Sequence, residues 1–259
     1  MRIEGSCIVV TGAAGGIGAA MVRRFHADGA RAVVVSDVDA EAAARVAAET
    51  GTDAIPCDVT DPAAIARLVE EVERRHGPID LFCSNAGILA LGGVELDDEP
   101  WRLSLDVNVM AHVWAARALV PRMLERGGGY LLQTASAAGL LTQIGSGPYS
   151  VTKHAAVALA EWLAITYGDQ GLKVSVLCPQ AVRTNMTAGI DGGGVAGVDG
   201  MLEPDDVANV VAEGLAREEF LILPHPEVRE YVQRKASDHD RWIGGMQRLQ
   251  RRFLGPPES

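Results

Sequence analysis

Short runs of apolar and β-branched residues recur along the chain, and each is followed by a longer segment with helical patterning. Because the runs are apolar at successive positions, both sides of each strand should be buried, as in parallel sheets covered by helices on both faces. This alternation predicts an α/β fold, a doubly wound parallel sheet of seven strands. The seven runs are "CIVVTG", "AVVVSD", "AIPCDV", "DLFCSNAG", "YLLQTAS", "VSVLCP" and "FLILP".

The segments between these runs are long enough for helices that cross from one strand to the next. Pro62 and Pro204 each lie in the first turn of such a segment, where the missing N–H costs no hydrogen bond. No internal repeat and no linker interrupts the pattern, so we expect a single domain over 1–259. The predicted helices are 16–28, 39–50, 61–76, 98–126, 149–169 and 204–217.

A core over 1–225 accounts for the seven runs, and residues 226–259 form a C-terminal extension. Apolar residues recur in this extension at helical spacing, which predicts an amphipathic helix packed on the body or on another subunit. Its seven basic and five acidic residues are too mixed for a nucleic-acid-binding arm. The apolar positions are Trp242, Ile243, Met246, Leu249 and Phe253.

Charge and residue spacing exclude several classes of partner. The net charge of -11 argues against affinity for nucleic acid or for anionic membranes, so a small-molecule substrate is expected. Glycine, serine, glutamine and proline break the longest uncharged run, 127–152, and no secretory signal is evident, which predicts a cytoplasmic protein. The four cysteines form no CxxC pair and the six histidines no metal-ligand pattern, so we expect no metal.

The first apolar run leads directly into the glycine-rich turn "TGAAGGIG" at 11–18. Gly12, Gly16 and Gly18 would let the backbone turn sharply beside a pyrophosphate, whose charge the N-terminus of the next helix stabilises, with Ile17 in the same turn. A tight strand-to-helix connection without a ligand would also account for these glycines. The turn is typical of a Rossmann-type nucleotide site.

Asp37 ends the second run, 19 residues after Gly18. A carboxylate there can accept hydrogen bonds from the ribose hydroxyls of adenosine and would repel a 2′-phosphate. Since none of Ala13, Ala14, Gly15 and Val38 supplies a compensating base, NAD is favoured over NADP. A turn residue at the end of a strand is the alternative interpretation of Asp37.

Tyr149 and Lys153 lie one turn apart on one face of a predicted helix that is otherwise mostly small and apolar. A neighbouring ammonium stabilises a phenolate and lowers its pKa, so this pair could exchange a proton with an alcohol. An amphipathic pair that extends its polar ends to solvent would show the same spacing.

Five motifs in order make the chain resemble the short-chain dehydrogenase/reductase family: "TGAAGGIG", "NAG" at 85–87, Asn108, Ser136 and "YSVTK" at 149–153. The resemblance implies that Tyr149 is the general acid or base and that Lys153 tunes it and holds the nicotinamide ribose. It also implies that Ser136 hydrogen-bonds the reacting oxygen and that Asn108 holds a water that relays protons. Alone, the serine would be a strand-end residue and the asparagine a polar kink in a helix.

The same resemblance assigns further contacts with NAD. Asn85 would brace the sheet, while Ala86 and Gly87 admit the adenosine ribose. Asp58 and Val59 would contact adenine, although an aspartate there could instead begin a helix. Val182 and Thr184 would contact the nicotinamide carboxamide. The chain departs from the family at Gln180, where a glycine is usual, which could alter the shape of the substrate pocket.

The expected activity is NAD(H)-dependent interconversion of a secondary alcohol and a ketone. The glycine-rich segment 189–200 falls where the family has a lid, and Arg183 is the one base near otherwise apolar positions, which favours an uncharged, fairly hydrophobic substrate. The resemblance also implies a homodimer or homotetramer. A dehydratase or epimerase on the same fold and a non-catalytic dinucleotide sensor are the alternatives. The apolar pocket candidates are Leu89, Leu91, Ala137, Leu140, Leu141 and Ile144.

Overall fold

Seven parallel strands form one sheet in the order β3-β2-β1-β4-β5-β6-β7, in a computed structural model that describes residues 1–255. The order reverses between β1 and β4, so the segments that follow these two strands run to opposite faces of the sheet and leave a crevice at the carboxyl ends, which is where such sheets bind ligands. The predicted doubly wound α/β fold is confirmed. The strands are β1 Cys7–Thr11, β2 Ala32–Ser36, β3 Asp53–Ala54, β4 Leu81–Ser84, β5 Gly129–Thr134, β6 Leu172–Leu177 and β7 Leu221–Ile222.

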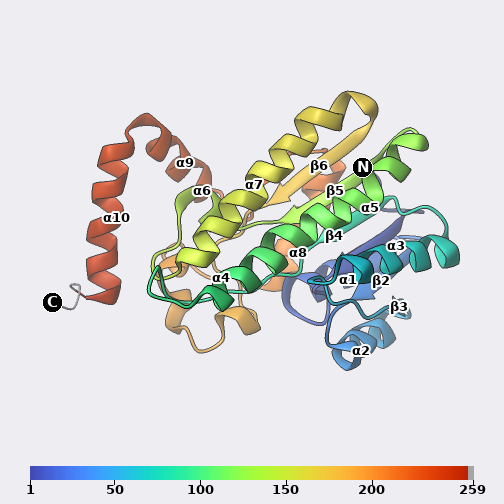
Figure 1. Cartoon of the computed structure of the whole chain (residues 1–259), viewed down its shortest axis with the longest axis horizontal. Coiled ribbons are helices and arrows are strands. Elements are labelled where there is room, and N and C mark those ends of the chain that lie inside the picture. Colours follow the sequence, from blue (N-terminus) through green and yellow to red (C-terminus); the bar gives the residue numbers. More distant parts are fainter. Residues whose placement is uncertain (256–259) are drawn as a thin grey trace.

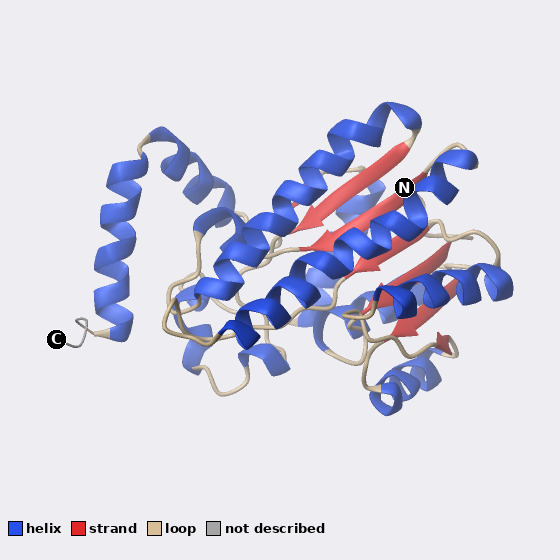
Figure 2. Ribbon diagram, in the orientation of Figure 1, coloured by secondary structure: helices blue, strands red, loops and turns tan. Residues whose placement is uncertain are grey.

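Helices cover both faces of the sheet (Figure 1; Figure 2). Successive strand residues point to opposite faces, so Val9 packs against α3, α5 and α7 while Ile8 and Val10 pack against α1, α2 and α8. Both layers are buried, which explains why the strands are apolar throughout. The helices are α1 Gly16–Ala27, α2 Ala40–Thr50, α3 Pro62–His76, α4 Asp98–Leu105, α5 Ala111–Glu125, α6 Ala138–Leu141, α7 Gly147–Tyr167, α8 Pro204–Ala216, α9 Glu227–Ser237 and α10 His239–Leu254.

Several predicted elements differ from the structure. The run "AIPCDV" contributes only Ala54 to a regular strand, Asp53–Ala54, although the Ile55 and Cys57 N–H groups still donate to the carbonyl oxygens of Val35 and Asp37. The single helix predicted at 98–126 is interrupted by a π-helical turn, Asp106–Met110. The helix predicted from Tyr149 begins two residues earlier, where the Ser146 side chain caps it.

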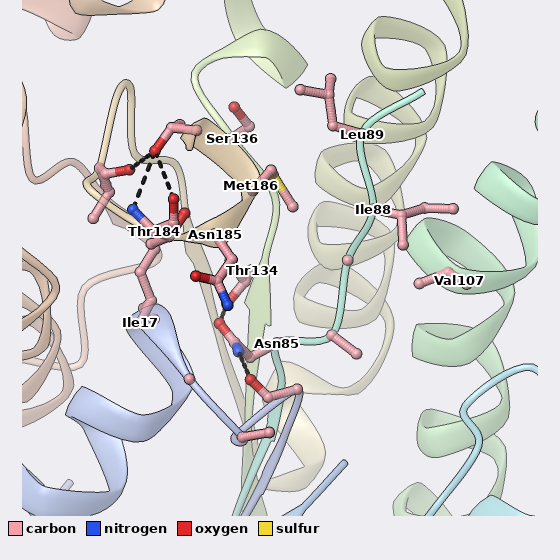
Figure 3. Close-up of a pocket in the computed structure, with 18 of the residues that line it drawn as sticks. Ile17, Asn85, Ile88, Leu89, Val107, Thr134, Ser136, Thr184, Asn185 and Met186 are labelled. Carbon is pink, nitrogen blue, oxygen red and sulfur yellow. Dashed lines mark hydrogen bonds between the residues drawn. The ribbon is translucent and has the colours of Figure 1, made fainter. Parts of the chain in front are cut away.

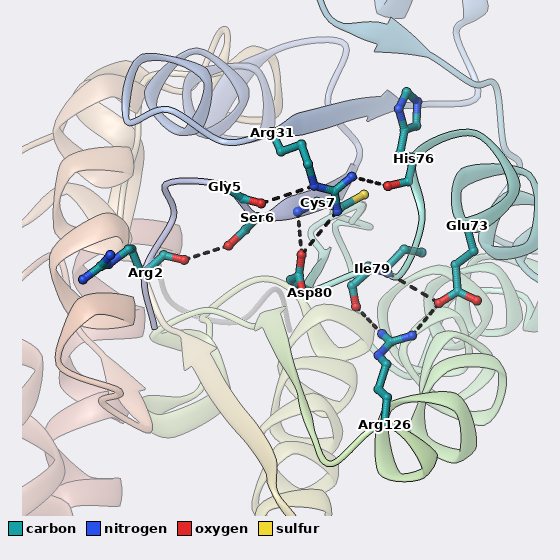
Figure 4. A network of polar contacts seen from close by, with 10 residues as sticks. All are labelled: Arg2, Gly5, Ser6, Cys7, Arg31, Glu73, His76, Ile79, Asp80 and Arg126. Carbon is teal, nitrogen blue, oxygen red and sulfur yellow. Dashed lines mark hydrogen bonds and ion pairs between the residues drawn. The ribbon is translucent and has the colours of Figure 1, made fainter.

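A network of polar groups closes the amino ends of the strands, opposite the crevice (Figure 4). The Cys7 backbone N–H donates to Asp80 at 2.7 Å, and Arg126 and Arg122 donate to Glu73 at 2.7 and 2.9 Å. Burial alone would raise the pKa of Glu73, but hydrogen bonds from Arg126, the Ile79 amide and Arg122 hold it below its ordinary value. These contacts fix α3 and α5 to the sheet far from the site.

The C-terminal extension forms two helices, α9 and α10, rather than the one predicted. Val228 of α9 is fully buried and packs with Ala137 and Leu141 beside α6, whereas α10 stands at the edge of the molecule (Figure 1). The last residues of the predicted extension, 256–259, lie outside the described part of the chain. Within residues 1–255, no helix combines the length and apolar character needed to cross a membrane.

Candidate active site

The glycine turn lies at the carboxyl end of β1 and opens α1. Gly16 has a φ of +54°, and a Cβ on Gly18 would lie 2.3 Å from the Gly12 carbonyl oxygen, so both positions require glycine. No side chain caps α1, whose N-cap residue is Gly15. The first N–H groups of this helix therefore face the crevice and can bind an anion.

Asp37 extends from the end of β2 to the same turn. Its carboxylate accepts a hydrogen bond from the Ala14 N–H at 3.0 Å and lines the crevice with Asp58 and Val59. Arg45 of α2 lines this end too and was missed in the sequence, because it lies eight residues beyond Asp37 and reaches the crevice only through the packing of α2.

The segment that follows β4 crosses the centre of the crevice. Asn85 donates to the carbonyl oxygens of Thr11 and Gly12 at 3.0 and 3.2 Å and accepts from the Thr134 hydroxyl at 3.1 Å. It thereby ties together the ends of β1, β4 and β5. A Cβ on Gly87 would lie 3.2 Å from the Lys153 Nζ, so glycine leaves room there for the ammonium.

Tyr149, Lys153 and Ser136 converge on the other end of the crevice. Lys153 is only 2% exposed, and its Nζ lies 5.5 Å from the centre of the Tyr149 ring and donates to the Thr134 carbonyl oxygen at 2.9 Å. Ser136, at the end of β5, accepts from the Ala138 N–H at 3.1 Å and donates to the Pro179 carbonyl at 3.3 Å. A phenol, a hydroxyl and an ammonium thus line one pocket.

The pKa values of this group are set mainly by burial. Burial lowers the pKa of Lys153 to about 8 from 10.5. It raises the pKa of the Tyr149 phenol above its ordinary value, and a hydrogen bond with the Ser136 side chain opposes that rise. This direction is opposite to the lowered phenol pKa expected from the sequence, because the effect of burial on the phenol outweighs the hydrogen bond with Ser136.

Asn108 lies in the π-helical turn and is fully buried behind the pocket rather than in its lining. Its side-chain oxygen accepts from the Ile88 N–H at 2.9 Å, and its amide nitrogen donates to the Ile88 carbonyl and the Thr152 hydroxyl at 3.0 and 3.1 Å. Both hydrogens of the amide group are therefore donated to protein groups, while the side-chain oxygen keeps a second lone pair that could accept from a relay water.

The crevice is a cavity of about 790 Å³ that runs from Asp37 to Tyr149. Figure 3 shows Ile17, Asn85 and Thr184 on one side, with Ile88 and Val107 facing them across the space. Uncapped N–H groups at one point and an acidic strand end beyond them fit an extended dinucleotide. The predicted cofactor residues that line it are Gly12, Gly16, Ile17, Asp37, Asp58, Val59, Asn85, Ala86, Gly87, Tyr149, Lys153, Val182 and Thr184, while Gly18 packs beneath the turn.

Gln180 lies beside Ser136, where two cavities meet. Its backbone N–H donates to His225 Nδ1 at 3.2 Å, whereas its buried side-chain oxygen has no partner within residues 1–255. Burial, the main cause, lowers the pKa of His225. An unpaired buried carbonyl costs free energy. Gln180 is thus placed to accept a hydrogen bond from a bound molecule.

The apolar positions named from the sequence do not all reach the pocket. Leu89 lines the crevice and Ala137 and Leu141 line the adjoining cavity, but Leu91 is 64% exposed. Leu140 and Ile144 line neither cavity. Among residues 1–255, no group of three or more histidine, cysteine or acidic side chains is arranged to hold a metal ion.

A parallel sheet with a glycine turn at its switch point, an acidic second strand end and a Tyr-Lys-Ser group defines an oxidoreductase of the dinucleotide-binding type. A family model described as short chain dehydrogenase matches residues 6–192. The 1-deoxy-11-beta-hydroxypentalenate dehydrogenase of Streptomyces exfoliatus is 40% identical over 238 residues, covering 88% of this chain and 86% of its own. The chain belongs to the short-chain dehydrogenase/reductase family.

The chain is also similar to a second dehydrogenase and to a solved structure of the same family. The meso-2,3-butanediol dehydrogenase of Serratia marcescens is 35% identical over 193 residues, covering 73% of this chain and 76% of its own. The crystal structure of a short-chain dehydrogenase/reductase from Burkholderia phymatum, in complex with NAD, superposes with a TM-score of 0.84 at 28% identity, covering 93% of this chain and 96% of that one.

Proposed function

We propose that the protein is an NAD(H)-dependent oxidoreductase that interconverts a secondary alcohol and a ketone on a hydrophobic small molecule. The observation that carries the proposal is the convergence of Tyr149, Ser136 and Lys153 at one end of a cavity whose other end holds Asp37. The names of similar proteins, which include a hydroxypentalenate dehydrogenase and a butanediol dehydrogenase, describe activity on hydroxyl groups and support this reaction class.

The proposed chemistry assigns each residue a task at the reacting oxygen. Bound NAD(H) would supply or accept the hydride. Tyr149 donates its phenolic proton to the ketone oxygen in reduction and accepts the alcohol proton in oxidation. Ser136 would turn its hydroxyl hydrogen from the Pro179 carbonyl to this oxygen and hold it there, and the buried Lys153 ammonium stabilises the phenolate that remains. Asn108 is a positioning residue that joins the segment after β4 to α7.

The cofactor preference is proposed from the ends of β2 and α2. The Asp37 carboxylate would accept hydrogen bonds from the adenosine ribose, which favours NAD over NADP. Arg45 at the same end is the one group in this lining that could offset a 2′-phosphate. We expect Asp37→Ala to reduce the NAD/NADP ratio of kcat/KM at least tenfold. An unchanged ratio would remove Asp37 as the selecting residue.

The test of the reaction follows the absorbance of reduced nicotinamide with purified protein, NAD and a panel of secondary alcohols. Tyr149→Phe should lower kcat by about 10² or more while the Kd for NADH stays within about threefold, because only the proton donor is removed. Tyr167→Phe, a tyrosine at the opposite end of α7, is the matched control and should keep full activity. If Tyr149→Phe retained full activity, the proposed mechanism would be wrong.

We also propose that the protein assembles as a homodimer or homotetramer through α4 and α7. Large apolar side chains on these helices are exposed, including Trp162 at 54% and Ile165 at 82%, and they would be covered by a second copy. Light scattering at micromolar concentration tests the assembly, and a monomer would refute it.

We also propose a cytoplasmic location. This location suits the four cysteines, all of which are buried free thiols.

A further inference from the structure

A second cavity of about 780 Å³ opens from the catalytic end of the crevice. Ser136, Gln143 and Gln180 line both cavities, so a molecule held at Ser136 can extend from one into the other. The far wall of the second cavity is built by α9 and α10 of the C-terminal extension. This cavity therefore adjoins the proposed reaction centre.

Several contacts hold the two helices in this position. Lys235 donates to the Leu140 carbonyl oxygen at 2.6 Å, and Trp242 packs against the cluster formed by Ala137, Leu141 and Val228. The Tyr231 hydroxyl donates to Asp199 at 2.9 Å, which joins α9 to the glycine-rich segment over the site. The wall formed by α9 and α10 is thus held to α6 on one side and to the glycine-rich segment on the other.

The lining of this cavity combines an apolar body with positive charge. Leu141, Val195, Trp242, Met246 and Leu249 provide the apolar surface. Three arginines line the same cavity against a single acidic residue, which is occupied in capping α10. The arginines are Arg234, Arg241 and Arg248, and the acid is Asp238.

Two of these arginines are free to bind an anion. Arg234 pairs with Glu230 of its own helix, whereas Arg241 and Arg248 form no ion pair within the described residues. The Arg248 guanidinium lies over a glycine pair of α10, since a Cβ on Gly244 would be 3.5 Å from its Nη1. Glycine destabilises a helix interior relative to alanine, but here the missing side chains leave room for the guanidinium.

From this arrangement we infer that α10 is the distal wall of the substrate site and that Arg241 and Arg248 bind the carboxylate of an amphipathic hydroxy acid. The inference rests on the proposed function, in which the secondary hydroxyl lies at Ser136 and Tyr149. Guanidinium groups match the planar carboxylate, and the apolar lining suits the hydrocarbon body between the two ends. It replaces the expectation of an uncharged substrate, which counted Arg183 as the one base near the site. Arg183 pairs with Glu203 at 2.7 Å outside both cavities, whereas Arg241 and Arg248 line the second cavity.

The experiment compares matched acids and esters on the full chain. The probes are 4-hydroxycyclohexanecarboxylate, a hydroxydecalin carboxylate and a 3-hydroxycholanate, each with its methyl ester and with a phosphate monoester of the same ring system. Binding to the protein with NADH is measured by calorimetry, and turnover with NAD by absorbance. We expect the acid that fits to bind at least about tenfold more tightly than its ester, because the ester lacks the charge-assisted hydrogen bonds.

Substitutions locate the carboxylate. Arg241→Met and Arg248→Met should each weaken binding of the acid by about 10-fold to 100-fold and change binding of the ester less than about threefold. Arg252→Met, on the same helix but outside the cavity lining, is the control and should change neither. A control effect as large as that of Arg248→Met would overturn the inference.

The outcomes separate this inference from the proposed function. Equal binding of acid and ester, preference for the phosphate monoester, or no binding of any acid overturns the inference, and turnover of the neutral probes would leave the proposed function intact. Selective, arginine-dependent binding of an acid supports the inference, and absence of turnover for every probe would then count against the proposed function alone.

Discussion

Replacing Lys153 by methionine should make the protein more stable while removing its activity. Lys153 is 2% exposed, and burial lowers its pKa from 10.5 to about 8. That difference corresponds to a cost on the order of 3 kcal/mol for holding the ammonium inside the folded protein at neutral pH. Methionine has a similar shape and no charge.

The net gain is smaller because one hydrogen bond is lost. The Lys153 ammonium donates to the Thr134 carbonyl oxygen at 2.9 Å, and removing this donor costs about 1 kcal/mol. The balance favours Lys153→Met by about 2 kcal/mol at pH 7. For a chain of this size we therefore expect the Tm to rise by about 5 °C.

The difference in stability between the parent protein and Lys153→Met should depend on pH. The folded-state pKa lies below the unfolded value, so the unfolded chain binds more protons between about pH 8 and pH 10.5. The stability of the unsubstituted protein should rise across this window, and Lys153→Met lacks that contribution. The advantage of the variant is therefore complete below pH 8 and shrinks as the pH approaches 10.5.

The assay is urea unfolding followed by tryptophan fluorescence at pH 7, 9 and 10, at one protein concentration. Lys173→Met is the control, since this lysine is exposed on the surface and its pair with Glu218 should be worth less than about 1 kcal/mol. A variant that is less stable than the parent at pH 7, or a difference that does not change between pH 7 and pH 10, would refute the reasoning.

Three further predictions concern packing, the polar network and the thiols. Gly139→Ala should lower the free energy of unfolding in urea by about 2 kcal/mol or more, because the added Cβ would lie 2.4 Å from the Lys153 carbonyl oxygen. The control Gly168→Ala, whose Cβ would meet no atom within 4 Å, should leave the stability unchanged or raise it slightly. Glu73→Gln should lower the free energy of unfolding by roughly 1–3 kcal/mol at pH 7. Because the folded protein lowers the pKa of Glu73, this loss should fade as the pH drops through that pKa, and an unchanged loss at pH 3 would contradict the prediction. Burial raises the pKa of all four cysteines, so a thiol reagent should label less than one per chain in the native protein and all four in urea.

Much of the fold and site could be predicted because regular geometry brings the relevant residues together. Tyr149 and Lys153 share a helix face at four-residue spacing, and parallel strands bring Asn85 and Ser136 to the same edge of the sheet. The glycine turn signals its own conformation, since a side chain at Gly18 would collide with the Gly12 carbonyl. These local and topological rules require no knowledge of packing.

What could not be predicted depends on backbone groups and on distant packing. The Thr134 carbonyl that accepts from Lys153 has no side-chain signature, and the contacts of Asn108 with Ile88 and Thr152 join residues that are far apart in the sequence. Arg248 enters the wall of a cavity only because the chain turns back between α9 and α10 (Figure 1). The sequence indicates that these residues are polar, but it does not indicate which groups they contact in the folded protein.

The strand order also has a consequence for synthesis of the chain. β1 is a central strand between β2 and β4, yet β4 is made only after two further helices and β3 have been added. While the chain emerges from the ribosome, the backbone N–H and C=O groups along one edge of the apolar strand β1 therefore have no neighbour, although β2 already covers the other edge. An unpaired apolar edge invites pairing with another chain. Nascent chains that end before Leu81 should thus be the ones most prone to aggregate and most dependent on chaperones.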